Sequence, residues 1–265
     1  MKKIYVVLVL LLLTYLTLLG VFYIKKSNSL VIIINSETIW EESLGRWTTH
    51  KSEQSISNFK NRKFNVYLSN EKIGKYRLNR EDNRWFLNDV KSDPSFGGYA
   101  NEYQKGLFAY SSNKKVKFKY AGKIGTNAVD YEFLNSVLKK LNIDDISDNY
   151  ETVSVTDFDI DNDGKKESFY VASNQSVYDV PDRPINEFFS IVFMVKNSKI
   201  YLISKETSKN SDLKTPSLNY FIDVDNDNKY EFIVEYAYYS NDHSYNYLYK
   251  LDESDNIKVL VYDKS

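Results

Sequence analysis

The feature that most constrains the fold is an acidic segment that occurs twice in the C-terminal half of the chain. The first copy is Asp159-Ile-Asp-Asn-Asp-Gly-Lys-Lys-Glu167, and the second, 64 residues further on, is Asp223-Val-Asp-Asn-Asp-Asn-Lys-Tyr-Glu231. Self-similarity at a fixed offset indicates that a supersecondary unit is repeated. The fold must therefore present the same kind of loop twice, at the same place in two similar units.

Each acidic segment is followed by apolar and aromatic stretches that polar turns separate. Short runs rich in Val, Ile, Tyr and Phe, bounded by Asn, Asp and Ser, are typical of strands. We expect one strand directly after each acidic loop and two more further on, which makes each unit a small antiparallel sheet. The later strands are predicted at 188–195 and 199–204 in the first unit and at 245–251 and 257–262 in the second.

The spacing of the carboxylates favours a divalent cation. Asp159, Asp161 and Asp163 stand at positions 1, 3 and 5 of the first loop, with Gly164 at 6 and Glu167 at 9. Alternate carboxylates in a turning backbone converge on one point, and oxygen ligands without His or Cys favour Ca²⁺, with Mg²⁺ less suited. The alternative is an Asx-rich turn, satisfied by its own backbone amides and holding no ion.

The candidate metal ligands are the acidic side chains of both loops, together with the main-chain carbonyl at position 7 of each. They are Asp159, Asp161, Asp163, Lys165, Glu167, Asp223, Asp225, Asp227, Lys229 and Glu231. An EF-hand needs a Glu at position 12 and an exiting helix, whereas Tyr170 stands there and the exit is β-prone. Each loop is therefore expected to join two strands.

A D-x-D-x-D-G-x-x-D/E loop that runs into a strand resembles the calcium loops of FG-GAP/VCBS repeats, found in integrin α-subunit propellers and many bacterial surface proteins. The resemblance covers at most roughly the last 115 residues. It implies a sheet-based, extracytoplasmic, calcium-binding module that usually takes part in adhesion or recognition. Asn228 replaces the Gly of the pattern in the second loop; because Asn tolerates left-handed backbone, we expect weaker binding there.

Ahead of the repeats, the sequence predicts a strand at 30–34, a short helix that Ser36 caps and that runs through Leu44, and a three-stranded meander within 63–89. The stretch 91–112 is predicted to be a long loop.

A further helix is predicted to begin near Asp130. Its apolar residues recur at helical spacing and are expected to pack on the sheet that follows. They are Tyr131, Leu134, Val137, Leu138 and Leu141.

The N-terminus carries an uncharged run from residue 4 to residue 24, flanked by two lysines on either side. At about 1.5 Å per residue, a helix of this length spans the roughly 30 Å hydrocarbon core of a bilayer. We predict an uncleaved single-pass anchor, with a signal peptide cleaved after Gly20 as the alternative. The flanking charges favour a cytoplasmic N-terminus, with the bulk of the chain outside the cell membrane.

The composition argues against several classes of function. The chain has no Cys and two His, which leaves almost nothing for thiolate, zinc or triad chemistry. A net charge of −1 gives no field suited to a nucleic-acid backbone. G-x-S-x-G, H-E-x-x-H, phosphate-loop and dinucleotide motifs are absent from the sequence, so we predict that the protein is not an enzyme.

Together these features predict an α+β, mostly β protein with a membrane anchor at 1–26, a β-rich region with one helix at 27–150 and two blade-like calcium-loop sheets at 151–265. A small β-propeller is the alternative architecture. We expect an extracytoplasmic calcium-binding module with a protein or glycan partner in the envelope. The alternatives are a cell-wall glycan-active enzyme or lectin that uses Tyr245, Tyr247 and Tyr249 as a sugar platform, and an inhibitor or immunity protein for a secreted partner.

Overall fold

The structure is a computed structural model in which the chain forms two compact units. The first comprises Met1–Val66 and Ile73–Lys115, and the second Tyr67–Lys72 and Val116–Ser265. The boundary predicted between residues 150 and 151 thus falls inside the second unit. The residues described are 14, 15, 17, 29–34, 38–51, 53–60, 62–81, 84–89, 107–113, 115–124, 127–143, 152–175, 188–209, 213–238 and 244–263.

The predicted membrane anchor lies almost entirely outside the described residues. Thr14, Tyr15 and Thr17 are described, and they are helical. Within the described part of the chain, no helix has both the length and the apolar character that crossing a bilayer requires.

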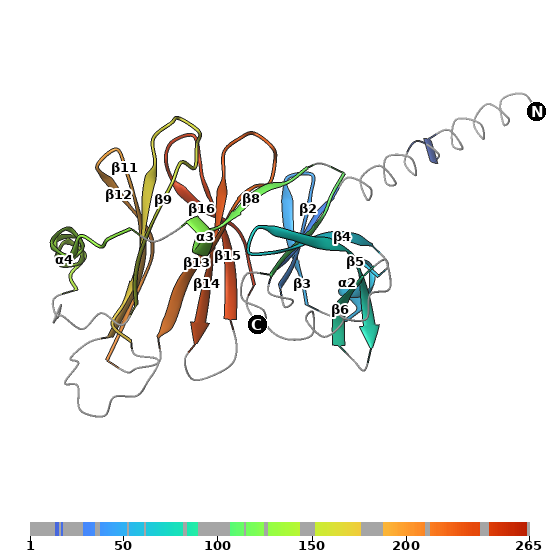
Figure 1. Cartoon of the computed structure of the whole chain (residues 1–265), viewed down its shortest axis with the longest axis horizontal. Coiled ribbons are helices and arrows are strands. Elements are labelled where there is room, and N and C mark those ends of the chain that lie inside the picture. Colours follow the sequence, from blue (N-terminus) through green and yellow to red (C-terminus); the bar gives the residue numbers. More distant parts are fainter. Residues whose placement is uncertain are drawn as a thin grey trace, which may run out of the picture. The chain divides into compact units, whose positions relative to one another are not determined.

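The first unit contains a seven-stranded sheet in the order β3-β2-β1-β7-β4-β5-β6. Figure 1 labels β2, β3, β4, β5 and β6 of this sheet, coloured blue to teal. The predicted strand at 30–34 and the predicted meander are both confirmed as parts of it. Its apolar core gathers around Val31, Ile33 and Phe64. The elements are β1 (Leu30–Ile34), β2 (Thr38–Ser43), β3 (Arg46–His50), α2 (Glu53–Ser57), β4 (Lys63–Leu68), β5 (Glu71–Glu81), β6 (Arg84–Asp89) and β7 (Leu107–Ser111).

Two predictions for this unit are wrong. The described part of the helix predicted from Ser36 to Leu44, residues 38–44, is not helical, because β2 pairs along β1 with Ile39 opposite Ile33, and Trp40 is fully buried there. Leu44 and Gly45 adopt positive φ angles of 56° and 74° and close the hairpin to β3. The predicted loop at 91–112 contains β7, a buried strand between β1 and β4.

The second unit contains two antiparallel sheets, one for each predicted repeat. The strand orders are β12-β11-β10-β9 and β16-β15-β14-β13-β8. Each acidic loop joins the first two strands of a four-stranded meander, as predicted, and β8 adds an edge to the second sheet. The strands are β8 (Lys117–Tyr120), β9 (Thr152–Phe158), β10 (Glu167–Ser173), β11 (Phe188–Lys196), β12 (Lys199–Ser208), β13 (Lys214–Asp223), β14 (Glu231–Tyr238), β15 (Ser244–Leu251) and β16 (Ile257–Tyr262).

The three sheets make the fold mostly β, as expected, but they do not form the alternative propeller. A propeller needs at least four similar four-stranded blades around one axis. The described ranges supply two sheets of the repeat type and one of seven strands.

The two sheets of the second unit pack on each other through an aromatic core. Phe169 of β10 contacts Phe221 of β13 and Phe232 of β14, with ring centroids 5.1 and 5.2 Å apart. All three side chains are fully buried. The opposing sheet faces therefore form one continuous core, and the acidic loops extend from strands that this core fixes.

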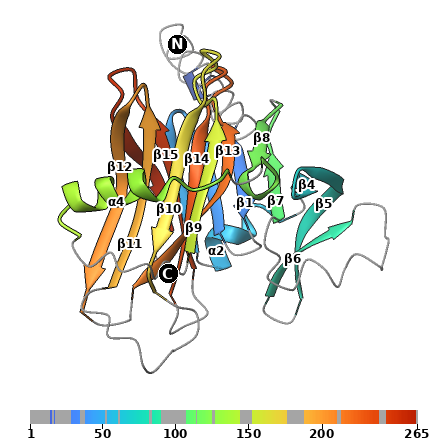
Figure 2. The same cartoon turned by 60° about the vertical axis from the view of Figure 1, so that its left-hand side comes forward.

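The described residues of this unit include the helices α3 (Ala121–Ile124) and α4 (Tyr131–Lys140). The predicted helix is confirmed as α4, with Asp130 as its N-cap accepting a hydrogen bond from Phe133 N at 2.9 Å. It covers the face of the first sheet that points away from the aromatic core (Figures 1 and 2). The buried contacts join Leu134, Val137 and Leu138 to Phe189, Ile191 and Phe193.

Candidate metal centre

The two acidic loops lie against each other at one end of the second unit. The backbone N–H of Tyr230 in the second loop donates to the carbonyl of Ile160 in the first, at 2.6 Å. The side-chain amide of Asn162 also donates to the carbonyl of Asn228. The sequence repeat thus brings two similar clusters of carboxylates into one region.

The first loop bends through left-handed backbone at two positions, Asn162 with a φ of 57° and Gly164 with a φ of 86°. This bend directs amides inward: the Asp159 carboxylate accepts from Asp163 N at 3.2 Å and from Gly164 N at 3.0 Å. The Asp163 carboxylate accepts from Lys165 N at 2.7 Å. These are the Asx bonds of the ion-free alternative, but each carboxylate has lone pairs beyond them.

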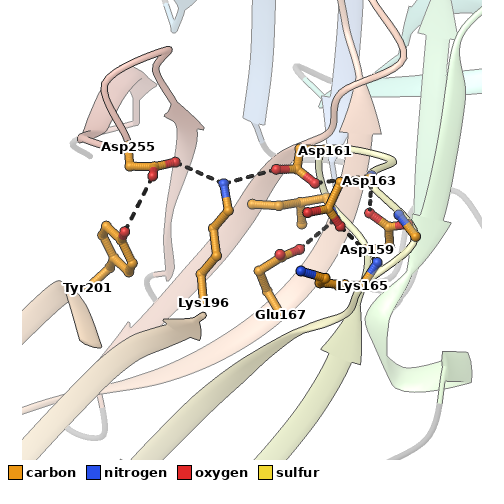
Figure 3. A network of polar contacts seen from close by, with 10 residues as sticks. Asp159, Asp161, Asp163, Lys165, Glu167, Lys196, Tyr201 and Asp255 are labelled. Carbon is orange, nitrogen blue, oxygen red and sulfur yellow. Dashed lines mark hydrogen bonds and ion pairs between the residues drawn. The ribbon is translucent and has the colours of Figure 1, made fainter. Parts of the chain in front are cut away.

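Three carboxylates of the first loop converge. Asp159, Asp161 and Glu167 each offer one oxygen, and these oxygens lie within 4.8 Å of one another (Figure 3). Glu167 is buried and accepts from Ile160 N at 2.9 Å, and its burial raises the pKa of its carboxyl. Asp163, also a predicted ligand, is not part of this group.

In the second loop the converging carboxylates are Asp223, Asp225 and Asp227, whose oxygens also lie within 4.8 Å of one another. Asn228 adopts a φ of 67° where Gly164 has 86°, so the left-handed bend survives the substitution. Glu231 is not in the group of three, but it accepts from Val224 N at 3.2 Å, just as Glu167 accepts from Ile160.

The Asp223 carboxylate is buried and only partly hydrogen-bonded. The residue is 1% exposed, and its Oδ1 has no hydrogen-bond partner among the described residues. Oδ2 accepts from Asn228 N at 3.3 Å and lies 3.7 Å from the ammonium of Lys117. Buried carboxylate oxygens are normally hydrogen-bonded, paired with a cation or bound to a metal.

Sequence analysis missed two lysines that reach into the clusters. Lys196 Nζ lies 2.9 Å from Asp161 Oδ2 and 2.8 Å from Asp255 Oδ1, and therefore joins the first loop to the β15–β16 turn (Figure 3). It comes from the last position of β11. The side chain is 11% exposed, so these ion pairs are largely shielded from solvent.

Lys250, near the end of β15, reaches further into the second loop. Its Nζ lies 2.8 Å from Asp225 Oδ2, 2.9 Å from Glu231 Oε1 and 3.6 Å from Asp227 Oδ2. The sequence signal is a lysine at the last or the penultimate position of the third strand of each unit. The fixed offset of 64 residues does not align the two lysines, because the link between the second and third strands is shorter in the second unit.

These ion pairs shift the pKa values of both partners. Burial opposes ionisation of Asp161 and Asp225, but the neighbouring ammonium groups outweigh it, and the pKa of each carboxyl is lowered. The same contacts raise the pKa of Lys196 and of Lys250 against the effect of burial. Burial raises the pKa of Glu231 to about 7 although Lys250 acts in the opposite sense.

The tyrosines considered as a sugar platform pack inward instead. Tyr245 and Tyr247 are partly buried against the core between the two sheets, and Tyr249 is 4% exposed within it. The hydroxyl of Tyr236 contacts Ser204 Oγ at 2.7 Å and the Tyr249 hydroxyl at 3.1 Å. Cross-strand packing therefore accounts for this aromatic face.

No protein-family model, curated protein or solved structure matches the chain. The functional argument therefore depends on the two loops. Their side chains offer carboxylate oxygens and contain neither His nor Cys, a donor set that suits hard cations. The buried, unpartnered oxygen of Asp223 independently fits such an ion.

Proposed function

We propose that the second unit is a calcium-binding β module whose two acidic loops hold Ca²⁺ and stabilise the loop end of the packed sheets. The observation that carries this proposal is the buried Asp223 carboxylate, with one oxygen that lacks a partner among the described residues, inside a cluster of three converging carboxylates. A cation at this point would both neutralise the cluster and supply the missing partner.

Calcium fits this set better than magnesium. Ca²⁺ takes six to eight oxygen ligands in flexible geometry, whereas Mg²⁺ requires a tight octahedron and keeps several waters. The carboxylates of the second loop differ in burial, with Asp223 buried and Asp225 and Asp227 exposed. Such an open cluster leaves room for water and for the carbonyl of Lys229 as further ligands.

The ion would act on stability because the loops emerge directly from the aromatic core. Phe158, just before the first loop, stacks on Phe221, two residues before the second, with centroids 4.1 Å apart and planes at 15°. Fixing both loops fixes the ends of the strands that carry these rings. At free calcium ten times Kd, each filled loop would stabilise the unit by about 1.4 kcal/mol.

The module would be displayed outside the cell. Extracellular calcium modules bind with a Kd of about 10⁻⁴ to 10⁻³ M, a range that suits a structural ion in calcium-rich surroundings. The uncharged run at 4–24 supports a membrane anchor on sequence grounds. We therefore propose a role in binding or envelope association, with a protein or glycan as partner.

Calorimetric titration of the full-length chain with Ca²⁺, after chelator treatment, tests the cation site directly. We expect binding in the range above, with Mg²⁺ weaker, and thermal unfolding at higher temperature in calcium than in chelator. Absence of calcium binding at millimolar concentration would refute the proposal.

A further inference from the structure

Each acidic loop faces a lysine from the same topological position of its sheet. Val195 lies opposite Ser168, and Tyr249 lies opposite Phe232. The next residue pair toward the loop therefore places Lys196 beside Glu167, and in the second sheet it places Lys250 beside Glu231. Each sheet therefore has its own acidic loop and its own lysine, which the neighbouring strand places beside that loop.

The ammonium groups pair with carboxylates of the two groups that could hold a metal ion. Lys250 Nζ is 2.8 Å from Asp225 and 3.6 Å from Asp227, two of the three converging carboxylates. A Ca²⁺ bound at about 2.3–2.6 Å from those carboxylates would lie within a few ångströms of the ammonium. Like charges at such a separation repel, so the metal and the ammonium compete for the cluster.

A cavity of about 220 Å³ adjoins both lysines. Its walls include Lys196 and Lys250 and also Asp252 and Glu253, two carboxylates that belong to neither loop. A lysine side chain is long and flexible enough to move its ammonium into such a space. Glu253 would there provide a counter-charge for a displaced ammonium, together with Asp252, which already pairs with Lys258 at 2.8 Å.

We propose that Lys196 and Lys250 are tethered counter-ions that hold the acidic loops together without metal and that an incoming Ca²⁺ displaces into this cavity. The inference rests on the proposed function, since it concerns how the same loops are filled and emptied. The lysines keep the metal-free carboxylates paired, so the module stays folded when calcium is low, and they set its calcium affinity.

The two lysines do not compete equally. Lys196 pairs with one carboxylate of the first loop, Asp161, and its second partner, Asp255, lies outside the loop. Lys250 lies near three carboxylates of the second loop, Asp225, Asp227 and Glu231. The first loop should therefore fill at lower calcium than the second.

The test compares Lys250→Gln with the matched control Lys214→Gln in the full-length chain carrying Asp161→Ala, which disables the first loop. The Lys214 side chain is 21% exposed, close to the 27% of Lys250. It pairs with Glu206 at 3.1 Å but contacts neither loop. We expect K250Q to bind Ca²⁺ about tenfold more tightly, the factor that corresponds to one charge-assisted hydrogen bond. K214Q should bind as its Asp161→Ala parent does.

A second measurement uses the unmutated chain, so it does not depend on whether a variant folds. Acetylation of Lys250 in the unmutated chain, followed by mass spectrometry, should become several-fold faster when Ca²⁺ is added, while that of Lys214 stays constant. If the unmutated chain binds calcium but Lys250 reactivity does not rise, or if folded K250Q binds no more tightly, displacement is wrong and the proposed function stands. If neither the unmutated chain nor K250Q binds calcium, both proposals fail.

Discussion

Replacing Asp223 by Asn should change the stability of the second unit in opposite directions with and without calcium. The substitution keeps the shape of the side chain and an oxygen that can accept from Asn228 N, but removes the charge. Without metal, the native carboxylate is fully buried, has one unpartnered oxygen and is close to two other acidic groups. The variant should therefore be the more stable protein in chelator.

The magnitudes follow from the geometry. Asp223→Asn replaces a buried charged group by a neutral amide, which costs less to bury, and it removes the repulsion from two acidic neighbours; the pair with Lys117 that is lost is long, at 3.7 Å, and partly exposed. We expect a net gain of about 1 kcal/mol in chelator. In calcium at ten times Kd, two filled loops should add about 2.8 kcal/mol to the native unit, or roughly 6–11 °C in Tm for about 150 residues. Asp223→Asn should lose about half of this shift.

Differential scanning calorimetry of the full-length chain, in chelator and in millimolar calcium, measures both signs at once. Asp130→Asn is the control, because the Asp130 carboxylate accepts the N–H of Phe133 at the start of α4 but joins neither cluster. It should keep the native calcium shift. Equal calcium shifts in Asp223→Asn and the native chain would refute the reasoning about the second loop, and a less stable variant in chelator would refute the argument from the unpartnered oxygen.

Further substitutions separate the loops from the core. Gly164→Ala should lower stability by about 1–2 kcal/mol through the strain of a left-handed backbone alone, since a Cβ there would meet no atom within 4 Å. Gly164→Asn should lower stability less, since Asn228 already adopts this backbone in the second loop. Asp161→Ala should remove the share of the calcium shift in Tm that comes from the first loop, as calorimetry with and without chelator would show. Phe169→Ala should lower the free energy of unfolding by about 3–5 kcal/mol in denaturant titrations, equally with and without calcium. Tyr236→Phe should lower it by about 1 kcal/mol, because it removes hydroxyl bonds within the core; a loss confined to calcium buffer would contradict the core assignments.

Local patterns were sufficient to predict the repeat and its strands. The strand predicted at 257–262 coincides with β16, and the helix predicted to begin near Asp130 is α4. β16 is a short, mostly apolar run bounded by polar residues, and the apolar side chains of α4 recur at helical spacing. The helix prediction was wrong for residues 38–44 because β2 forms by pairing with β1, and local propensity along the chain carries no information on that pairing.

The same distinction, between local patterns and long-range contacts, applies to the candidate metal site. The carboxylates of Asp159, Asp161 and Glu167 converge because a tight turn brings nearby residues together, so their spacing was informative. The exclusion of Asp163 depends on which way the carboxylate turns, and it turns toward Lys165 N. Lys196 reaches the first loop from a strand that follows it by many residues, and only the sheet register reveals that contact.

The topology of the meander explains why a lysine on the third strand reaches the loop in both units. The second strand leaves the acidic loop, and the third, antiparallel to it, returns to the same end, so the last residues of β11 and β15 lie beside the glutamates that begin β10 and β14. A lysine at that position, coupled to an acidic loop, is thus a property of the repeated unit as a whole. Duplicating the unit duplicates both the carboxylates and the lysine that pairs with them, as the proposed counter-ion role requires.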